Sequence, residues 1–152
     1  MRQRETRVDS APFSLTLPSD ARMVPVARAF VEAVCQACDL HRSATYALVL
    51  AVGEAVSNII RHAHHGCPDA PLHIYCRPSA DSLELLLLDE GDPFDLSSVP
   101  LLDPTEMRLG GRGVFLMRSL MDEVTCAQRQ PRGNVLRLVK RFGSDAGMRD
   151  CG

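Results

Sequence analysis

The chain has 152 residues, of which 45% are hydrophobic and 24% are charged, with a formal net charge of −2. This length and balance fit one globular domain, and the charge gives no general attraction to nucleic acid or to an anionic membrane. Lys140 is the one lysine among the 17 basic residues, which excludes a P-loop and the strand lysine of ordinary protein kinases.

No apolar run approaches the roughly 20 residues that span a membrane. The N-terminal residues carry charges but no apolar stretch, so we expect no secretory signal. The six cysteines are therefore expected to be reduced thiols of a cytoplasmic protein. We expect a single domain over residues 11–142, between flexible segments at 1–10 and 143–152.

The hydrophobic pattern predicts the elements of this domain. They are expected in the following chain order: a strand at 13–17, a helix from about 20 to 38, a helix at 43–63, strands at 72–77 and 83–89, a long loop at 90–112, a helix at 113–121, and a hairpin of 123–129 and 134–142. Hairpins outnumber crossovers in this order. We therefore predict an α+β two-layer sandwich, in which a mixed, mostly antiparallel sheet carries about three helices on one face.

Polar side chains follow one side of the second expected helix. Glu54, Asn58 and Arg61 lie together on the side opposite the apolar stripe, and on their own they fit a solvated face. However, Ala47 and Ala51 lie on the same side of the helix one or two turns earlier. Because this side begins with apolar residues, we expect its first turns to be covered by other parts of the protein. A semi-buried carboxylate and amide need polar partners.

An acidic residue ends the expected strand at 83–89. Because side chains alternate, Asp89 shares a face with Leu85 and Leu87. Asp89 and Gly91 form an Asp-x-Gly sequence, which is common in turns. At the floor of a pocket, the same carboxylate would accept a hydrogen bond from an exocyclic amine.

Three glycines, Gly110, Gly111 and Gly113, lead directly into the short helix that continues with Val114. A flexible loop before a helix explains this sequence. The alternative is an anion site, because glycines let the backbone approach a ligand and a helix N-terminus offers free N–H groups. Arg112 would supply positive charge to such a site.

Together these segments resemble the nucleotide-binding boxes of the histidine-kinase-like ATPase (GHKL or Bergerat) superfamily. The matching residues are Glu54, Asn58, His62 and Ala63 in the first box, Asp89, Gly91 and Phe94 in the second, and Gly111 and Gly113 in the third. Within the superfamily, segments 89–95 and 110–124 most resemble the anti-sigma-factor serine/threonine-protein kinases. The resemblance implies the histidine-kinase-like ATPase fold and binding of ATP or ADP with Mg²⁺.

The resemblance also implies roles for individual residues. Asn58 would be the Mg²⁺ ligand, Glu54 would act as general base or orient the nucleophile, and Asp89 would accept from the adenine amino group. Residues 96–110 would form a lid. Further nucleotide contacts are expected from Arg61, His62, Gly91, Phe94, Gly110, Gly111, Arg112, Gly113 and Val114.

Two other clusters admit metal or redox interpretations. We interpret Cys35 and Cys38 as small hydrophobic residues of a helix. His62, His64, His65 and Cys67 could hold a transition metal, but histidines near a helix C-terminus also complement its dipole, and we favour this second interpretation.

The resemblance implies a protein-serine kinase that binds a sigma factor and phosphorylates an anti-sigma-factor antagonist, working as a homodimer in the cytoplasm without direct contact to nucleic acid or membrane. The alternative is a nucleotide-binding regulator that sequesters a protein partner without phosphoryl transfer. A fused two-component histidine kinase is disfavoured, because 152 residues leave no room for its helical phosphoacceptor hairpin.

Overall fold

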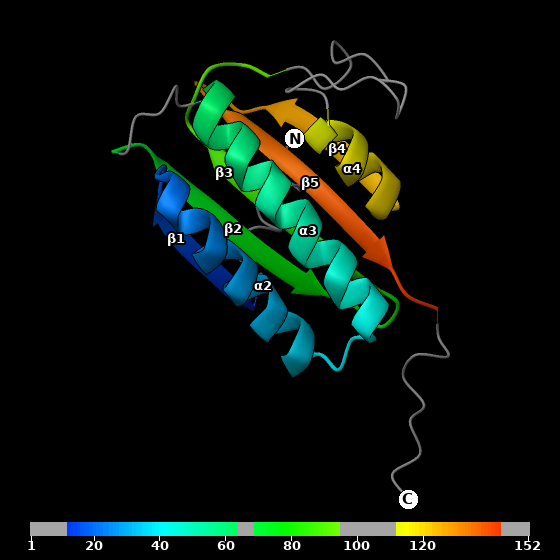
Figure 1. The fold of residues 1–152 in the computed structure, drawn as a ribbon. Helices are drawn as coiled ribbons and strands as arrows, with labels where there is room; N and C mark the ends of the chain where they lie inside the picture. Colours follow the sequence, from blue (N-terminus) through cyan, green and yellow to red (C-terminus); the bar gives the residue numbers. More distant parts are fainter. Residues whose placement is uncertain (1–11, 64–68, 95–111, 144–152) are drawn as a thin grey trace, which may run out of the picture.

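The computed structural model describes residues 12–63, 69–94 and 112–143, and it has two layers (Figure 1). One layer is a five-stranded sheet with the order β1-β2-β3-β5-β4. Its strands are β1 (Phe13–Pro18), β2 (Pro71–Pro78), β3 (Ser82–Asp89), β4 (Glu123–Gln128) and β5 (Asn134–Arg141). Each of these pairings is antiparallel. The α+β architecture predicted from the element order is confirmed, but the sheet is antiparallel throughout its described strands, whereas a mixed, mostly antiparallel sheet was predicted.

Among the described residues, three α-helices cover one face of the sheet, as Figure 1 shows. They are α2 (Val24–Ala37), α3 (Arg42–Asn58) and α4 (Arg112–Leu120). A 3-10 turn, η1 (Ala21–Met23), precedes α2, and the Asp20 side chain caps it by accepting from the Arg22 N–H at 2.9 Å. The helix expected from about residue 20 therefore begins as a 3-10 turn before it becomes α-helical.

The expected helix at 43–63 changes character near its end. It is α-helical only to Asn58 and continues as a π-helical turn, η2 (Ile59–Ala63). A π turn adds one residue to the local repeat, so the 3.6-residue stripe does not continue through it. As a result, the consecutive residues Ile59 and Ile60 are both buried.

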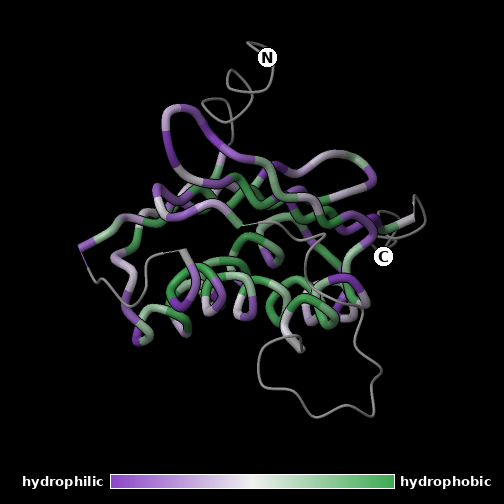
Figure 2. The backbone as a smooth tube through the Cα atoms, turned by 90° about the horizontal axis from the view of Figure 1, so that it is seen from above, coloured by the Kyte–Doolittle hydropathy of each residue, from purple (hydrophilic) through white to green (hydrophobic). Residues whose placement is uncertain are grey.

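The hydrophobic core lies between the two layers. Fully buried side chains on the inner face of the sheet, such as Ile74, Leu85 and Leu87, pack in one cluster with Val52 and Val56 of α3. Figure 2 shows the two layers from the side, with hydrophobic positions in both. Burial of this apolar surface, at about 25 cal/mol per Å², fixes α3 against the centre of the sheet.

The pairing of β3 with β5 places polar residues at one end of this core. Asp89, the last residue of β3, lies directly opposite Asn134, the first residue of β5. Asp89 continues the inward-facing series of Leu85 and Leu87, as strand alternation predicted. Both polar residues are almost completely buried, with exposed fractions of 1% and 2%.

Although the sequence has no uninterrupted apolar run of about 20 residues, the segment Arg42–His62 is long and apolar enough on average to cross a membrane by length and composition alone. In the fold it is the central helix of the helical layer, and most of its apolar window is buried inside the domain. A core helix passes this test because packing against a sheet also requires apolar side chains.

Candidate functional site

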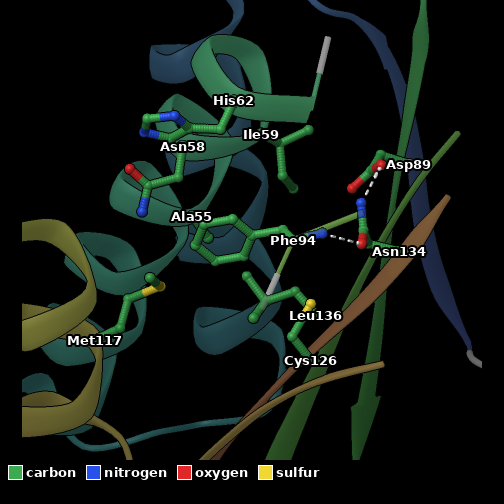
Figure 3. Close-up of a pocket in the computed structure, with 10 residues that line it drawn as sticks. All are labelled: Ala55, Asn58, Ile59, His62, Asp89, Phe94, Met117, Cys126, Asn134 and Leu136. Carbon is green, nitrogen blue, oxygen red and sulfur yellow. Dashed lines mark hydrogen bonds between the residues drawn. The ribbon is translucent and has the colours of Figure 1, made fainter. Parts of the chain in front are cut away.

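A pocket lies at the end of the core where α3, α4, β3 and β5 meet (Figure 3). It is lined by Ala55, Asn58, Ile59, His62, Asp89, Phe94, Met117, Cys126, Asn134 and Leu136. Asn58 and His62 come from the first predicted segment, and Asp89 and Phe94 come from the second. Segments far apart in the sequence therefore meet at one cavity that is apolar in the middle and polar at its sides.

The polar side of α3 is covered where α4 packs against it. Asn58 is buried, with 8% of its surface exposed, and Glu54 is half-buried. This is the partial burial that the apolar start of this side predicted. Glu54 makes no hydrogen bond or ion pair with the part of the chain that the structure describes, so its carboxylate is available to a ligand.

Gly113 brings α4 close to these two side chains. A Cβ built on Gly113 would lie 2.8 Å from Glu54 Oε2 and 3.2 Å from Asn58 Nδ2. Any other residue would have to push one or both of these side chains aside. The third predicted segment thus reaches the first through the glycine that opens α4.

Arg61 lies beside Asn58 rather than inside the pocket. Its Nη2 donates to Asn58 Oδ1 at 2.9 Å, and the residue is exposed. This bond fixes which end of the Asn58 amide is oxygen, because a guanidinium can only donate. It also shows that a positive charge is accommodated at this oxygen.

Within the described residues, only one oxygen of the Asp89 carboxylate accepts hydrogen bonds. Oδ1 accepts from the Gly91 N–H at 2.8 Å and from Asn134 Nδ2 at 3.0 Å. The first of these bonds is the turn contact that an Asp-x-Gly sequence favours. Oδ2 has no hydrogen-bond partner among the described residues. A buried carboxylate oxygen without a donor is costly, so the pocket is suited to a ligand that donates there.

Phe94 forms the middle of the pocket wall. Its ring stacks on the ring of His62, with centroids 6.2 Å apart and an interplanar angle of 19°. Figure 3 shows the Phe94 ring between the polar groups of α3 on one side and those of β3 and β5 on the other. A flat apolar wall of this kind suits a planar ring.

Asn134 is a pocket residue that sequence reasoning missed. Its side chain bonds to Asp89, to the Asp92 carbonyl at 2.8 Å and to the Phe94 N–H at 3.0 Å. Asn134 directly follows the turn residue Gly133 and opens the strand expected at 134–142, so its sequence context indicated only the start of a strand. The strand register, which puts it opposite Asp89, is the signal that could have found it.

Several of the predicted site residues do not line the pocket, and others lie outside the described residues. Val114 is buried in the core, with 2% of its surface exposed. Arg112 begins α4, and its side chain lies outside the described residues, as do Gly110, Gly111 and the expected lid at 96–110.

Of the two clusters with a metal or redox interpretation, the structure describes Cys35 and Cys38 but only part of the histidine cluster. His64, His65 and Cys67 fall outside the described ranges. Within those ranges no group of three or more His, Cys, Asp or Glu side chains is arranged to hold a metal ion. Cys35 is fully buried and burial raises its pKa to about 11. Burial likewise raises the pKa of Cys38. Both shifts fit their interpretation as small hydrophobic residues.

Comparisons with known proteins identify the family of this chain. Residues 17–140 match the family model of the histidine kinase-like ATPase domain. Serine-protein kinase RsbW of Listeria innocua is 31% identical over 119 residues, which cover 73% of this chain and 76% of the relative. The protein of that name from Staphylococcus aureus is 38% identical over 85 residues, covering 50% of this chain and 54% of the relative.

A structural relative supports the fold alone. A chain in the crystal structure of the SiaB-SiaC complex from Pseudomonas aeruginosa superposes with a TM-score of 0.64 at 15% identity, covering 91% of this chain and 94% of that chain. The family model spans the three segments that form the pocket and the glycine contact beside it, and the RsbW alignments cover up to three quarters of the chain. This chain therefore belongs to the histidine kinase-like ATPase family, in the group of relatives of the anti-sigma-factor kinase RsbW that its sequence resembles.

Proposed function

We propose that this protein is an ATP-dependent protein-serine kinase and anti-sigma factor, which binds a sigma factor and phosphorylates a serine of an anti-sigma-factor antagonist. The observation that carries the proposal is the convergence of Asn58, Asp89 and Gly113 at one end of the helix–sheet interface. These residues are far apart in the chain, and each has the chemistry that one part of a magnesium–adenine nucleotide requires.

The adenine base suits the side of the pocket formed by β3 and β5. Asp89 is buried, and its Oδ2, which has no hydrogen-bond partner among the described residues, would accept from an exocyclic amine, which adenine carries. Gly91 is buried beside it and, having no side chain, lets the base approach the backbone. The Phe94 ring supplies an apolar wall for the base.

The phosphates and Mg²⁺ suit the opposite side, between α3 and the start of α4. When bound, Mg²⁺ neutralises phosphate charge, and it prefers oxygen ligands. Asn58 Oδ1 is such an oxygen, and it already accepts from a cationic group of Arg61. The N-terminal N–H groups of α4 favour anions. Arg61 would release Asn58 and turn its charge to the phosphates.

Glu54 is the residue to which we assign the proton transfer. It lies one turn before Asn58 on the same side of α3, so it would sit beside the phosphate end of the nucleotide. Its carboxylate has no protein partner within the described residues. It would accept the proton of the attacking serine hydroxyl or orient that hydroxyl, while positioning and charge supply the rest of the catalysis.

The partners follow from the relatives named RsbW and from the sequence resemblance, not from a contact in this chain. We propose a sigma factor and an antagonist protein as alternative partners, with nucleotide state deciding between them. We further propose that the protein works as a homodimer in the cytoplasm.

Incubation of the purified protein with Mg²⁺, labelled ATP and a candidate antagonist tests the proposal. The expected product is phosphoserine on the antagonist, and an antagonist with that serine changed to alanine should remain unlabelled. Tight ATP binding without transfer to any antagonist would instead favour a regulator that sequesters its partner. Absence of any adenine-nucleotide binding would contradict both functions.

A further inference from the structure

Asn134 stands where the hairpin of β4 and β5 meets the end of β3. It is 98% buried, lies opposite Asp89 in the strand pairing and lines the pocket. We infer that Asn134 is a positioning residue that sets the base specificity of the pocket by holding Asp89 and the loop that follows it. This inference rests on the proposed nucleotide-binding function.

The bonding capacity of Asn134 is used almost completely by the protein. A carboxamide offers two N–H hydrogens and one oxygen. Nδ2 donates to Asp89 Oδ1 at 3.0 Å and to the Asp92 carbonyl at 2.8 Å, and Oδ1 accepts from the Phe94 N–H at 3.0 Å. No N–H hydrogen of the side chain remains for a ligand. Asn134 therefore acts through Asp89 and Phe94 rather than as a donor to the base.

These bonds decide which oxygen of Asp89 faces the ligand. Oδ1 is held by two donors, Asn134 Nδ2 and the Gly91 N–H, so rotation of the carboxylate would break both bonds. Oδ2 is then presented in a fixed direction. A base that carries an amine at this point is accepted, and a base that carries a carbonyl oxygen there is repelled. Base discrimination thus depends on the amide of Asn134 as well as on the carboxylate.

The backbone around this contact has its own supports. Arg129 Nη1 donates to the Asp89 carbonyl at 3.1 Å. Gly133 has a φ of +110°, and a Cβ on it would collide with the same carbonyl. The hairpin is therefore docked against β3 without the Asn134 side chain. Removal of that side chain should loosen the carboxylate and the loop while the fold remains.

The test compares Asn134→Ala with Arg132→Ala. Arg132 is a matched control because its exposed guanidinium pairs with Asp92 of the same loop at 3.1 Å but does not bond to Asp89. Equilibrium binding of ATP and of GTP is measured by calorimetry for both variants and the wild type. We expect Asn134→Ala to weaken ATP binding by about 10- to 100-fold while GTP binding changes little. We expect Arg132→Ala to keep the wild-type ratio of the two affinities.

A purely structural role would lower the melting temperature without changing this ratio. Asn134→Ser, which keeps one donor, should retain an intermediate ratio, and it takes the place of the alanine variant if that variant does not fold. A kinase assay should give a higher KM for ATP with kcat largely retained. An unchanged ATP-to-GTP ratio in a folded variant overturns the inference. A wild-type protein that binds neither nucleotide overturns the proposed function instead.

Discussion

Gly113 at the start of α4 lies directly against Glu54 of α3, so close that a Cβ on the glycine would come within 2.8 Å of the carboxylate oxygen Oε2. The two residues are almost sixty positions apart in the chain, and their contact joins the polar side of α3 to the helix that follows the glycine-rich segment. A small change at this contact should therefore affect chemistry more than folding.

Gly113→Ala is expected to leave the melting temperature nearly unchanged and to lower phosphoryl transfer by about 10- to 100-fold. The folded state tolerates the methyl group because the nearest atom is the far end of the flexible Glu54 side chain, and alanine favours a helix over glycine by about 0.5–1 kcal/mol. The displaced carboxylate, however, no longer meets the attacking hydroxyl. Thermal unfolding and transfer assays on the same preparation test this, and full activity in the variant would contradict it.

Glu54→Gln is expected to reduce the rate of phosphoryl transfer by about 10²–10⁴ while ATP still binds. Glutamine keeps the size of the side chain but cannot accept the proton of the serine hydroxyl. Ser57→Ala is the control on the same helix, because within the described residues the Ser57 hydroxyl makes one hydrogen bond, donated to the carbonyl of Gly53 at 2.9 Å. If Glu54→Gln keeps the wild-type rate, another group accepts the proton.

The fold was predictable from the sequence because its strands and helices are marked by clear periodicity. The inward position of Asp89 followed from alternation along β3, and the partial burial of Asn58 followed from the alanines before it on α3. Both positions depend on local pattern, and the structure places both residues as expected.

The π-helical turn and the role of Asn134 could not be predicted in the same way. The pattern of α3 stays apolar through Ile59 and Ile60, so nothing local indicates that one extra residue enters the turn there. Asn134 is the first strand residue after the turn glycine, and its place in the pocket depends on its bond to Asp89, which lies 45 residues away in the chain. Only the register of β3 with β5 brings the two together, and register is a property of the whole sheet.

Asp89→Asn is expected to weaken adenine-nucleotide binding by about 1–3 kcal/mol. The amide oxygen can replace Oδ1 as the acceptor from the Gly91 N–H, which leaves an NH₂ group where Oδ2 faced the base. A donor would then meet the amine of adenine. Calorimetry with ADP tests this, with Asp81→Asn, an exposed residue in the β2–β3 turn, as the control. Equal affinity in the Asp89 variant would remove Asp89 from the base site.

Asn58→Ala is expected to abolish the contribution of Mg²⁺ to ATP binding. In the wild type, ATP should bind more tightly with Mg²⁺ than with EDTA, because the Asn58 oxygen would hold the ion. In the variant the two affinities should become nearly equal.

Arg61→Ala tests the same oxygen in the opposite direction. It frees Asn58 Oδ1 from its 2.9 Å bond, so it should lower the Mg²⁺ concentration needed for half-maximal ATP binding. A wild-type Mg²⁺ dependence in Asn58→Ala would exclude Asn58 as the ligand.

The buried thiols predict how stability changes at alkaline pH. Burial raises the pKa of Cys76 from 9.0 to about 12, and it raises that of Cys35 to about 11. In the unfolded chain both thiols ionise near pH 9, whereas in the folded protein they stay protonated. The stabilisation by the two protonated thiols is therefore present below pH 9 and is lost as the pH rises toward 12. While a thiol is ionised only in the unfolded chain, the free energy of unfolding falls by about 1.4 kcal/mol per pH unit for that thiol.

Urea unfolding with a reductant at pH 8, 9 and 10 measures this decline. Cys76→Ala should be less stable at pH 8, because it leaves a cavity, but its free energy of unfolding should fall less steeply above pH 9. Identical slopes for the variant and the wild type would mean that Cys76 ionises equally in the folded and unfolded states.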